Sequence, residues 1–222
     1  MNRKSILTLG AAAAAVLALA ACSSGSASPE ASETPESRVE AQEAVPTVEE
    51  PETAALSGVW VAESYTGAVM TVEWDLDPTD ERVAELEAFR VATGAEEVSY
   101  TAVDIDNRQG TDYQNLYPTE IFDEAGAVTE LIDGQEAATA WAPELIWSDD
   151  GGSDRTVNAA GEEISEEEAV ALNGQWVDLD TPSGASPGER VTVILVGPPD
   201  LPADAAGVIL RDASAYPVEG QE

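Results

Sequence analysis

From about residue 56 onward, the alternation of hydrophobic and polar positions predicts a series of short β-strands. Gly, Asn, Asp and Pro separate these apolar, β-branched and aromatic runs, which lie at residues 59–61, 68–74, 98–106, 115–117, 121–123, 127–132, 191–196 and 207–211. Residues 191–196 are mostly β-branched and apolar, which indicates a strand that is buried on both faces or central in a sheet. Many short strands with few helices favour a mainly β, antiparallel β-sandwich.

One or two short helices interrupt this pattern. Apolar residues at spacing three predict a helix over 79–93, with Thr79 as its N-cap and Gly94 just past its end. Residues 165–168 form a capping box with acidic residues in the first turn, and we expect residues 173–174 to close that second helix. The pattern does not assign residues 137–147 to an element, and it predicts a loop over residues 148–161.

The first 22 residues resemble the export signal of a bacterial lipoprotein. Arg3 and Lys4 precede an uncharged, mostly apolar run over residues 6–21, which is the pattern of a secretory signal. Leu19-Ala20-Ala21-Cys22 resembles the lipobox, in which the Cys thiol receives diacylglycerol before signal peptidase II cleaves. The alternative is an incidental thiol in an ordinary signal peptide. Because Cys22 is the only Cys of the chain, we expect lipidation there and no disulfide.

These signals divide the chain into four parts. Residues 1–21 are the expected signal peptide, and residues 22–55 are rich in Ser, Pro, Ala and Glu and predict a disordered acidic tether. About 33 residues of flexible chain have a root-mean-square span of about 30 Å, so the tether would hold the domain away from the membrane. The β-sandwich domain is expected over residues 56–216, and a flexible tail over 217–222.

The composition restricts the chemistry that the chain can perform. It has 44 acidic and nine basic residues, for a formal net charge of −35, and it has no His. Such a charge repels nucleic acid, so we expect no nucleic-acid partner. Cys22 and Lys4 are the only Cys and the only Lys, so the mature domain lacks the residues for Ser-His-Asp, Cys-His or Ser-Lys catalysis and for His- or Cys-based zinc sites.

Two weak candidate sites remain. Asp149, Asp150 and Asp154 lie in a Gly-containing loop and could supply oxygen ligands to Ca²⁺, although a plain acidic loop has the same composition. Trp141 and Trp147 flank a segment without a strand pattern and could form a platform that stacks on sugars, although packing is the commoner role of such residues. Residues 104–112 resemble a Ca²⁺ loop but depart from the EF-hand pattern, which favours a solvated strand end.

A second resemblance concerns the domain itself. Residues 103–107 end a strand with Val-Asp-Ile-Asp-Asn, residues 122–126 form a turn between two strands, and Pro187-Gly188-Glu189-Arg190 leads into a Val-rich strand. Over residues 97–212 this order is similar to the immunoglobulin-like extracellular domains of lipoproteins from high-GC Gram-positive bacteria. The resemblance implies an immunoglobulin-like sandwich and no particular activity.

Together these features predict a lipoprotein on the outer face of the cell membrane. We expect its domain to be a non-enzymatic interaction module whose partners are an envelope protein or a cell-wall component. The alternative is a carboxylate-dependent protein that binds or cleaves cell-wall glycans, which would need two facing Asp or Glu residues across a cleft. Beyond the covalent lipid on Cys22, the only cofactor considered is Ca²⁺.

The anchor yields the first testable prediction. The Cys22→Ala variant should lose the lipid, so the protein should be released from membranes or accumulate as an uncleaved precursor. Membrane fractionation and mobility on denaturing gels measure both effects. Normal processing together with full membrane retention of the variant would refute lipidation at Cys22.

Overall fold

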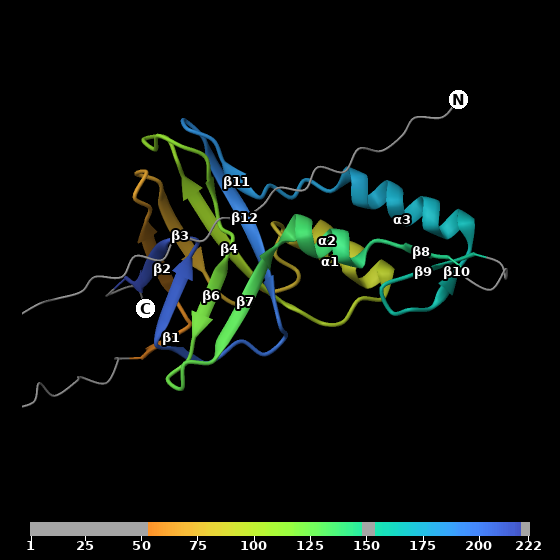
Figure 1. Cartoon of the computed structure of the whole chain (residues 1–222), viewed down its shortest axis with the longest axis horizontal. Coiled ribbons are helices and arrows are strands. Elements are labelled where there is room, and N and C mark those ends of the chain that lie inside the picture. Colours follow the sequence, from red (N-terminus) through yellow and green to blue (C-terminus); the bar gives the residue numbers. More distant parts are fainter. Residues whose placement is uncertain (1–52, 148–153, 219–222) are drawn as a thin grey trace, which may run out of the picture. The chain divides into compact units, whose positions relative to one another are not determined.

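Eight antiparallel strands pair side by side in an unbroken ring in the computed structural model (Figure 1). The structure describes residues 53–147 and 154–218, which belong to the compact unit Val48–Glu222. In their order around the ring, the strands are β12 (Arg190–Gly197), β4 (Ser99–Asp106), β3 (Val69–Glu73), β2 (Val59–Glu63), β15 (Ala213–Pro217), β14 (Gly207–Leu210), β6 (Thr119–Phe122) and β7 (Val128–Asp133).

The pairing is long on one side of the ring and short at two joints. Strands β12 and β4 share eight residue pairs, and β3 and β4 share five. By contrast, β7 meets β12 only through Leu195↔Asp133 and Val196↔Ile132. Strand β15 meets β2 only through Tyr216↔Val61 and Pro217↔Trp60. The barrel therefore consists of two four-stranded halves that two short contacts connect.

The mainly β, antiparallel class predicted from the sequence is confirmed, whereas the immunoglobulin-like sandwich is not. A sandwich has two separate sheets, each with free edges. Here the halves would be those two sheets, but the joints β2–β15 and β7–β12 connect them into a closed ring. Closure satisfies the backbone groups that edge strands would otherwise expose. The pattern of apolar residues along single strands does not distinguish the two arrangements, because both require the same alternation.

Alternate residues of the strands fill the barrel interior, as the two-residue period of a strand requires. Trp60 of β2 packs edge-to-face against Trp74, with ring centroids 5.9 Å apart. The interior core also includes Met70, Val72, Val103, Ile105, Ile121, Leu131, Val193, Leu195, Val208 and Leu210.

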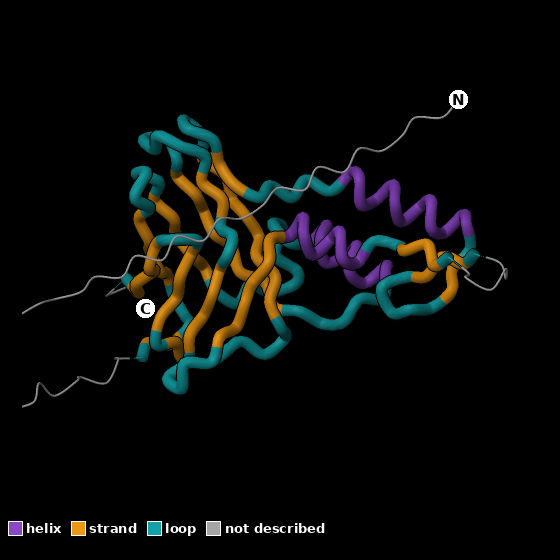
Figure 2. Tube along the Cα trace, viewed as in Figure 1, coloured by secondary structure: helices purple, strands orange, loops and turns teal. Residues whose placement is uncertain are grey.

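Three helices gather on one side of the barrel (Figure 2). They are α1 (Ala84–Thr93), α2 (Gly134–Trp141) and α3 (Glu166–Asp178). A second core lies where they cover the sheet, and it contains Leu86, Phe89, Ala137, Ala138, Leu172, Tyr100, Ala102, Ile194 and Val196. The last four residues are the outward side chains of β4 and β12. These two strands are thus buried on both faces where the helices cover them. This confirms the prediction for residues 193–196, whereas Val191 is partly exposed and Thr192 is exposed.

The helix boundaries differ from the sequence prediction in two places. Helix α1 begins at Ala84, and Thr79 lies before it in a turn, with its N–H and Oγ both bonded to Asp77 Oδ1. Gly94 is left-handed, with φ of 73°, and ends α1 as predicted. In α3 the Ser165 cap is confirmed, but the helix continues past Gly174 to Asp178. A Gly inside a helix costs only about 1 kcal/mol relative to Ala, so it does not by itself end one.

Several short elements were not predicted. Helix α2 occupies part of the unassigned segment, and its N-cap Asp133 accepts a hydrogen bond from the Glu136 N–H. The expected loop over 148–161 contains β9 (Arg155–Val157), which pairs with β8 (Glu144–Ile146) and β10 (Glu163–Ile164). Two further pairs join β1 (Ala54–Ala55) to β13 (Asp204–Ala205) and β5 (Gln114–Asn115) to β11 (Gly184–Ala185). Within the described residues, no helix has the length and apolar character to cross a membrane.

A polar network attaches α1 to the outer face of β4. The Tyr100 hydroxyl donates to Glu87 Oε2 at 2.8 Å, and Arg90 binds both oxygens of the same carboxylate at 2.7 and 2.8 Å. Arg90 also donates to the carbonyl oxygens of Ala95 and Glu96, just past the helix end. Its guanidinium lowers the pKa of Glu87, and burial together with Glu87 raises the pKa of Tyr100.

This network predicts a pH-dependent contribution to stability. Because the pKa of Glu87 is lowered by folding, its contribution is complete above the ordinary carboxyl pKa of about 4.3 and is lost as the pH falls through the lower folded-state value. Glu87→Gln should therefore reduce the free energy of unfolding at pH 7 and reduce its decline below about pH 4. Urea denaturation between pH 3 and pH 8 measures both effects, with the exposed Glu97→Gln as control. Equal pH profiles for the two variants would contradict the prediction.

Candidate functional site

Where the helices no longer cover the barrel, the outward residues of β3, β4 and β12 become polar. Asp104 pairs in register with Thr71 on one side and with Thr192 on the other. One row further along, Asp106 lies opposite Arg190. The alternation that directs Val103 and Ile105 into the barrel directs these side chains toward solvent.

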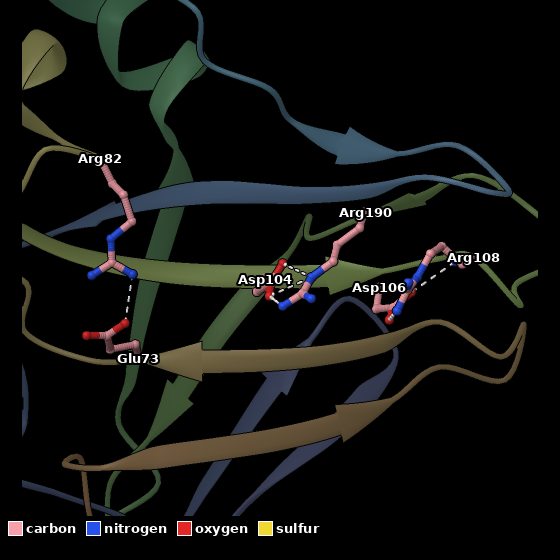
Figure 3. Close-up of polar contacts among 6 residues, drawn as sticks. All are labelled: Glu73, Arg82, Asp104, Asp106, Arg108 and Arg190. Atoms are coloured by element: carbon pink, nitrogen blue, oxygen red, sulfur yellow. Dashed lines mark hydrogen bonds and ion pairs between the residues drawn. The ribbon is translucent and has the colours of Figure 1, made fainter.

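Ion pairs connect this polar face along β4 (Figure 3). Arg190 binds Asp104, the carboxylate two positions from its own register partner, with Nε 3.1 and 3.0 Å from the two oxygens. Arg108 binds Asp106, with Nε 2.9 Å from Oδ1. These hydrogen bonds lower the pKa of Asp106 to about 2. Both arginine side chains are more than half exposed, so these pairs contribute little to stability and mainly organise the surface charge.

Arg82 extends the same face toward α1. Its Nη1 is 2.7 Å from Glu73 Oε2 on β3, and its Nη2 is 2.7 Å from Asp80 Oδ2 (Figure 3 shows the contact with Glu73). The hydrogen bonds from Arg82 lower the pKa of Asp80 to about 2. Two carboxylates therefore share one guanidinium, and the cluster carries a net negative charge.

A groove of about 380 Å³ lies next to Arg82, between α1, β12 and residues 179–182. We call it the α1–β12 groove. Its apolar lining residues are the most buried ones, and they are Leu86, Leu179, Pro182 and Ile194. Its polar lining residues are Glu81, Arg82, Glu85, Asp180, Thr181 and Thr192, most of them exposed. The groove thus has an apolar floor and a mainly acidic rim.

The second surface is one end of the barrel, formed by residues 64–67, 107–118, 183–189 and 211–212, which we call the loop end. Backbone hydrogen bonds join its segments: Thr111 N–H donates to Thr66 O, Gly188 N–H to Asn107 O, and Arg211 N–H to Pro118 O. The β5–β11 pair adds further backbone bonds. The loop end is therefore a connected surface, although its segments lie far apart in the sequence.

Asn107 is the centre of the loop end. Its side chain is fully buried, and Nδ2 donates to Asp112 O and Ala185 O, both at 2.9 Å. Its backbone N–H donates to Glu189 O, and its carbonyl oxygen also accepts from Gly110 N–H. A Cβ at Gly110 would lie 1.7 Å from Asn107 Oδ1, so only glycine fits there.

Three tyrosines of the loop end are exposed to solvent. Tyr65, Tyr113 and Tyr117 have exposed fractions of 79, 43 and 65%. Tyr113 is held in place from two sides, because Arg211 Nη1 donates to its carbonyl oxygen and its hydroxyl lies 3.4 Å from Ser183 Oγ. Tyrosine side chains are enriched in protein interfaces, because they present a large area with few rotatable bonds.

The two tryptophans suggested by the sequence differ in their exposure to solvent. Trp141 ends α2 and packs against the core beneath the helices, whereas Trp147 follows β8 and is 71% exposed. Among the described residues, the aromatic ring contact is between Trp60 and Trp74 instead. Binding of sugars by Trp141 and Trp147 stays a prediction.

The other nominated residues lie mostly outside the described part of the chain. This holds for Cys22, Asp149 and Asp150, whereas Asp154 is described and immediately precedes β9. In residues 53–147 and 154–218, no three Asp, Glu, His or Cys side chains gather in a way that could hold a metal ion. Calcium binding by the 149–154 loop stays a prediction.

Among the residues that the structure describes, the carboxyls with a displaced pKa are all displaced downward. They are Asp77, Asp80, Glu87 and Asp106, and in each case hydrogen bonds to the carboxylate are the main cause. The general acid of a glycosidase needs the opposite shift, because it must stay protonated near neutral pH.

Comparisons of the chain with protein-family models, with curated proteins and with solved structures find no match.

Sequence reasoning missed both surfaces. Alternation does place Asp104 and Asp106 on one face of a strand, and this was the available signal for the polar face. No local pattern indicates that Arg190, 86 residues away, binds Asp104. The loop end was equally hidden, because a buried Asn and a Gly in a polar turn look like ordinary loop residues.

Asn107 provides the second stability prediction. Asn107→Asp replaces a buried amide donor with a carboxylate that faces two carbonyl oxygens, so the free energy of unfolding should fall by about 2–4 kcal/mol at pH 7. Asn158→Asp is the matched control, because Asn158 Oδ1 accepts from Glu162 N–H and Asp preserves that acceptor. The control should change stability by less than about 0.5 kcal/mol in the same urea titration. Equal losses in both variants would show that Asn107 does not hold the loop end together.

Proposed function

We propose that this protein is a lipoprotein, anchored through Cys22 to the outer face of the cell membrane, whose β-barrel domain is a non-enzymatic interaction module of the cell envelope. The anchor rests on the lipobox-like residues 19–22, and the acidic segment over residues 22–55 would carry the domain away from the membrane. The partner is an envelope protein or a cell-wall component that contacts the loop end.

The observation that carries this proposal is the set of exposed tyrosines on loops that are fixed by buried hydrogen bonds. Ordering a mobile loop on binding costs free energy, so a preformed surface binds more tightly than a flexible one with the same contacts. Tyr113 and its neighbours are held by the Asn107 bonds and the β5–β11 pair. Tyr65 and Tyr117 then present aromatic surface to a partner, and the loops that carry them lose little conformational entropy on binding.

The remaining chemistry agrees with recognition. The arginines of the polar face, Arg82, Arg108 and Arg190, are each bound to carboxylates, so they are poorly placed to attract an anionic ligand. The downward pKa shifts give no support to the alternative of a glycan-cleaving enzyme, since that reaction needs a carboxyl with a raised pKa.

Site-specific photocrosslinking in intact cells tests the proposal. Tyr117, 65% exposed, is replaced by p-benzoylphenylalanine in the full anchored chain, and Tyr216 on β15, 67% exposed, is replaced in the same way as a matched control. We expect irradiation to give discrete crosslinked species, to protein or to wall material, from position 117 and not from position 216. Mass spectrometry identifies the adducts.

A second variant makes this test selective for the surface. Tyr65→Ala, combined with the crosslinker at position 117, should weaken the discrete adducts, because both residues belong to the loop end. Equal crosslinking from positions 117 and 216, or none from 117, would overturn the assignment of this surface.

A further inference from the structure

We infer that the α1–β12 groove receives a lysine or arginine side chain of the partner protein. This inference rests on the proposed function and specifies it, because it assigns a chemical character to part of the partner's surface. It commits to a protein partner with an exposed basic residue.

The shape of the groove suits one long side chain. A volume of about 380 Å³ is near the lower end of the range of small-ligand pockets, about 300–1,000 Å³. Its floor is formed by Leu86 and Ile194, which are part of the core beneath the helices, together with Leu179 and Pro182. This floor is apolar surface that a chain of methylene groups would cover.

The charge of the residues at the groove entrance determines the charge of the ligand that can bind there. Glu81, Glu85 and Asp180 line it, and each of these side chains is exposed at the surface. The one cation that lines it, Arg82, is bound to both Asp80 and Glu73 at 2.7 Å. The charge that a ligand meets is therefore negative, and an anionic ligand would be repelled.

Lysine and arginine combine the two properties that the groove requires. Their methylene stems cover apolar surface while their charged heads stay near solvent or near carboxylates. A purely apolar side chain would instead bring the rim carboxylates into a less hydrated environment without pairing them, which is unfavourable. Thr181 and Thr192 add hydroxyl acceptors beside the rim.

The position of the groove connects it to the loop end. Thr192 lines the groove, and Glu189, three residues earlier, belongs to the loop end. A strand advances about 3.3 Å per residue, so the two surfaces are separated by about 10 Å along β12. A partner that covers this distance would contact the loop end and insert a basic side chain into the groove.

An NMR titration of the domain with N-acetyl-lysine methylamide tests this inference directly. We expect shifts of the backbone amides of residues 85–86, 179–181 and 192. Two matched ligands measure the apolar and the electrostatic contributions to binding separately. The norleucine analogue keeps the methylene chain of lysine without its charge, and methylammonium keeps the charge without the methylene chain. Both should bind more weakly than the lysine derivative. Shifts spread evenly over the acidic surface, or equal binding of methylammonium, would overturn the inference.

Variants separate the groove from the general acidity of the protein. Glu85→Gln combined with Asp180→Asn should weaken lysine binding about fivefold, whereas Glu97→Gln with Glu130→Gln, an equal change of charge away from the groove, should change it less than about twofold. Thr192→Phe, which obstructs the groove without altering the charge, should also weaken binding. Equal effects of the two double variants would refute the site.

The crosslinking experiment and the lysine titration together distinguish this inference from the proposed function. If crosslinking from position 117 persists while the lysine derivative fails to bind the groove, the groove assignment alone is wrong. If position 117 gives no adduct, the loop end is refuted as the contact surface, whatever the groove binds.

Discussion

The burial of β4 and β12 on both faces is the constraint on which the rest of the structure depends. Their inward residues fill the barrel, and their outward residues Tyr100, Ala102, Ile194 and Val196 lie under the helices. The long β4–β12 pairing supports both cores at once. Without the helical layer, these four outward side chains would face water, so the barrel and the helices stabilise each other.

The same layer determines where binding surfaces can form. The helices cover only part of the outer face of β4 and β12, and the strands turn polar at Asp104 and Thr192, where the cover ends. The α1–β12 groove lies along that boundary, so its floor is apolar and its rim is acidic. The loop end lies further along these strands, since residues 107–118 follow β4 and residues 183–189 precede β12. Both surfaces are therefore joined to the two strands with the longest pairing.

Residues that act locally could be recognised from the sequence, and those that act over long distances could not. The Ser165 cap and the Gly94 helix end depend on neighbours within a few residues, and both were predicted correctly. The Asp133 cap carried the same kind of signal but was overlooked. Asn107 differs, because its partner Ala185 is 78 residues away and nothing in its neighbourhood marks it as buried.

The sequence by itself determined the strand-rich character of the domain, the double burial of residues 193–196, the high negative charge and the absence of His, because these follow from composition and from short periodic patterns. Only the tertiary structure decided that the strands close into a barrel, since two residue pairs at each of two joints distinguish a barrel from a sandwich. It also decided which carboxylates bind arginines and which line the groove. Side-chain alternation specifies the face on which a residue lies, whereas its partners depend on how distant strands align.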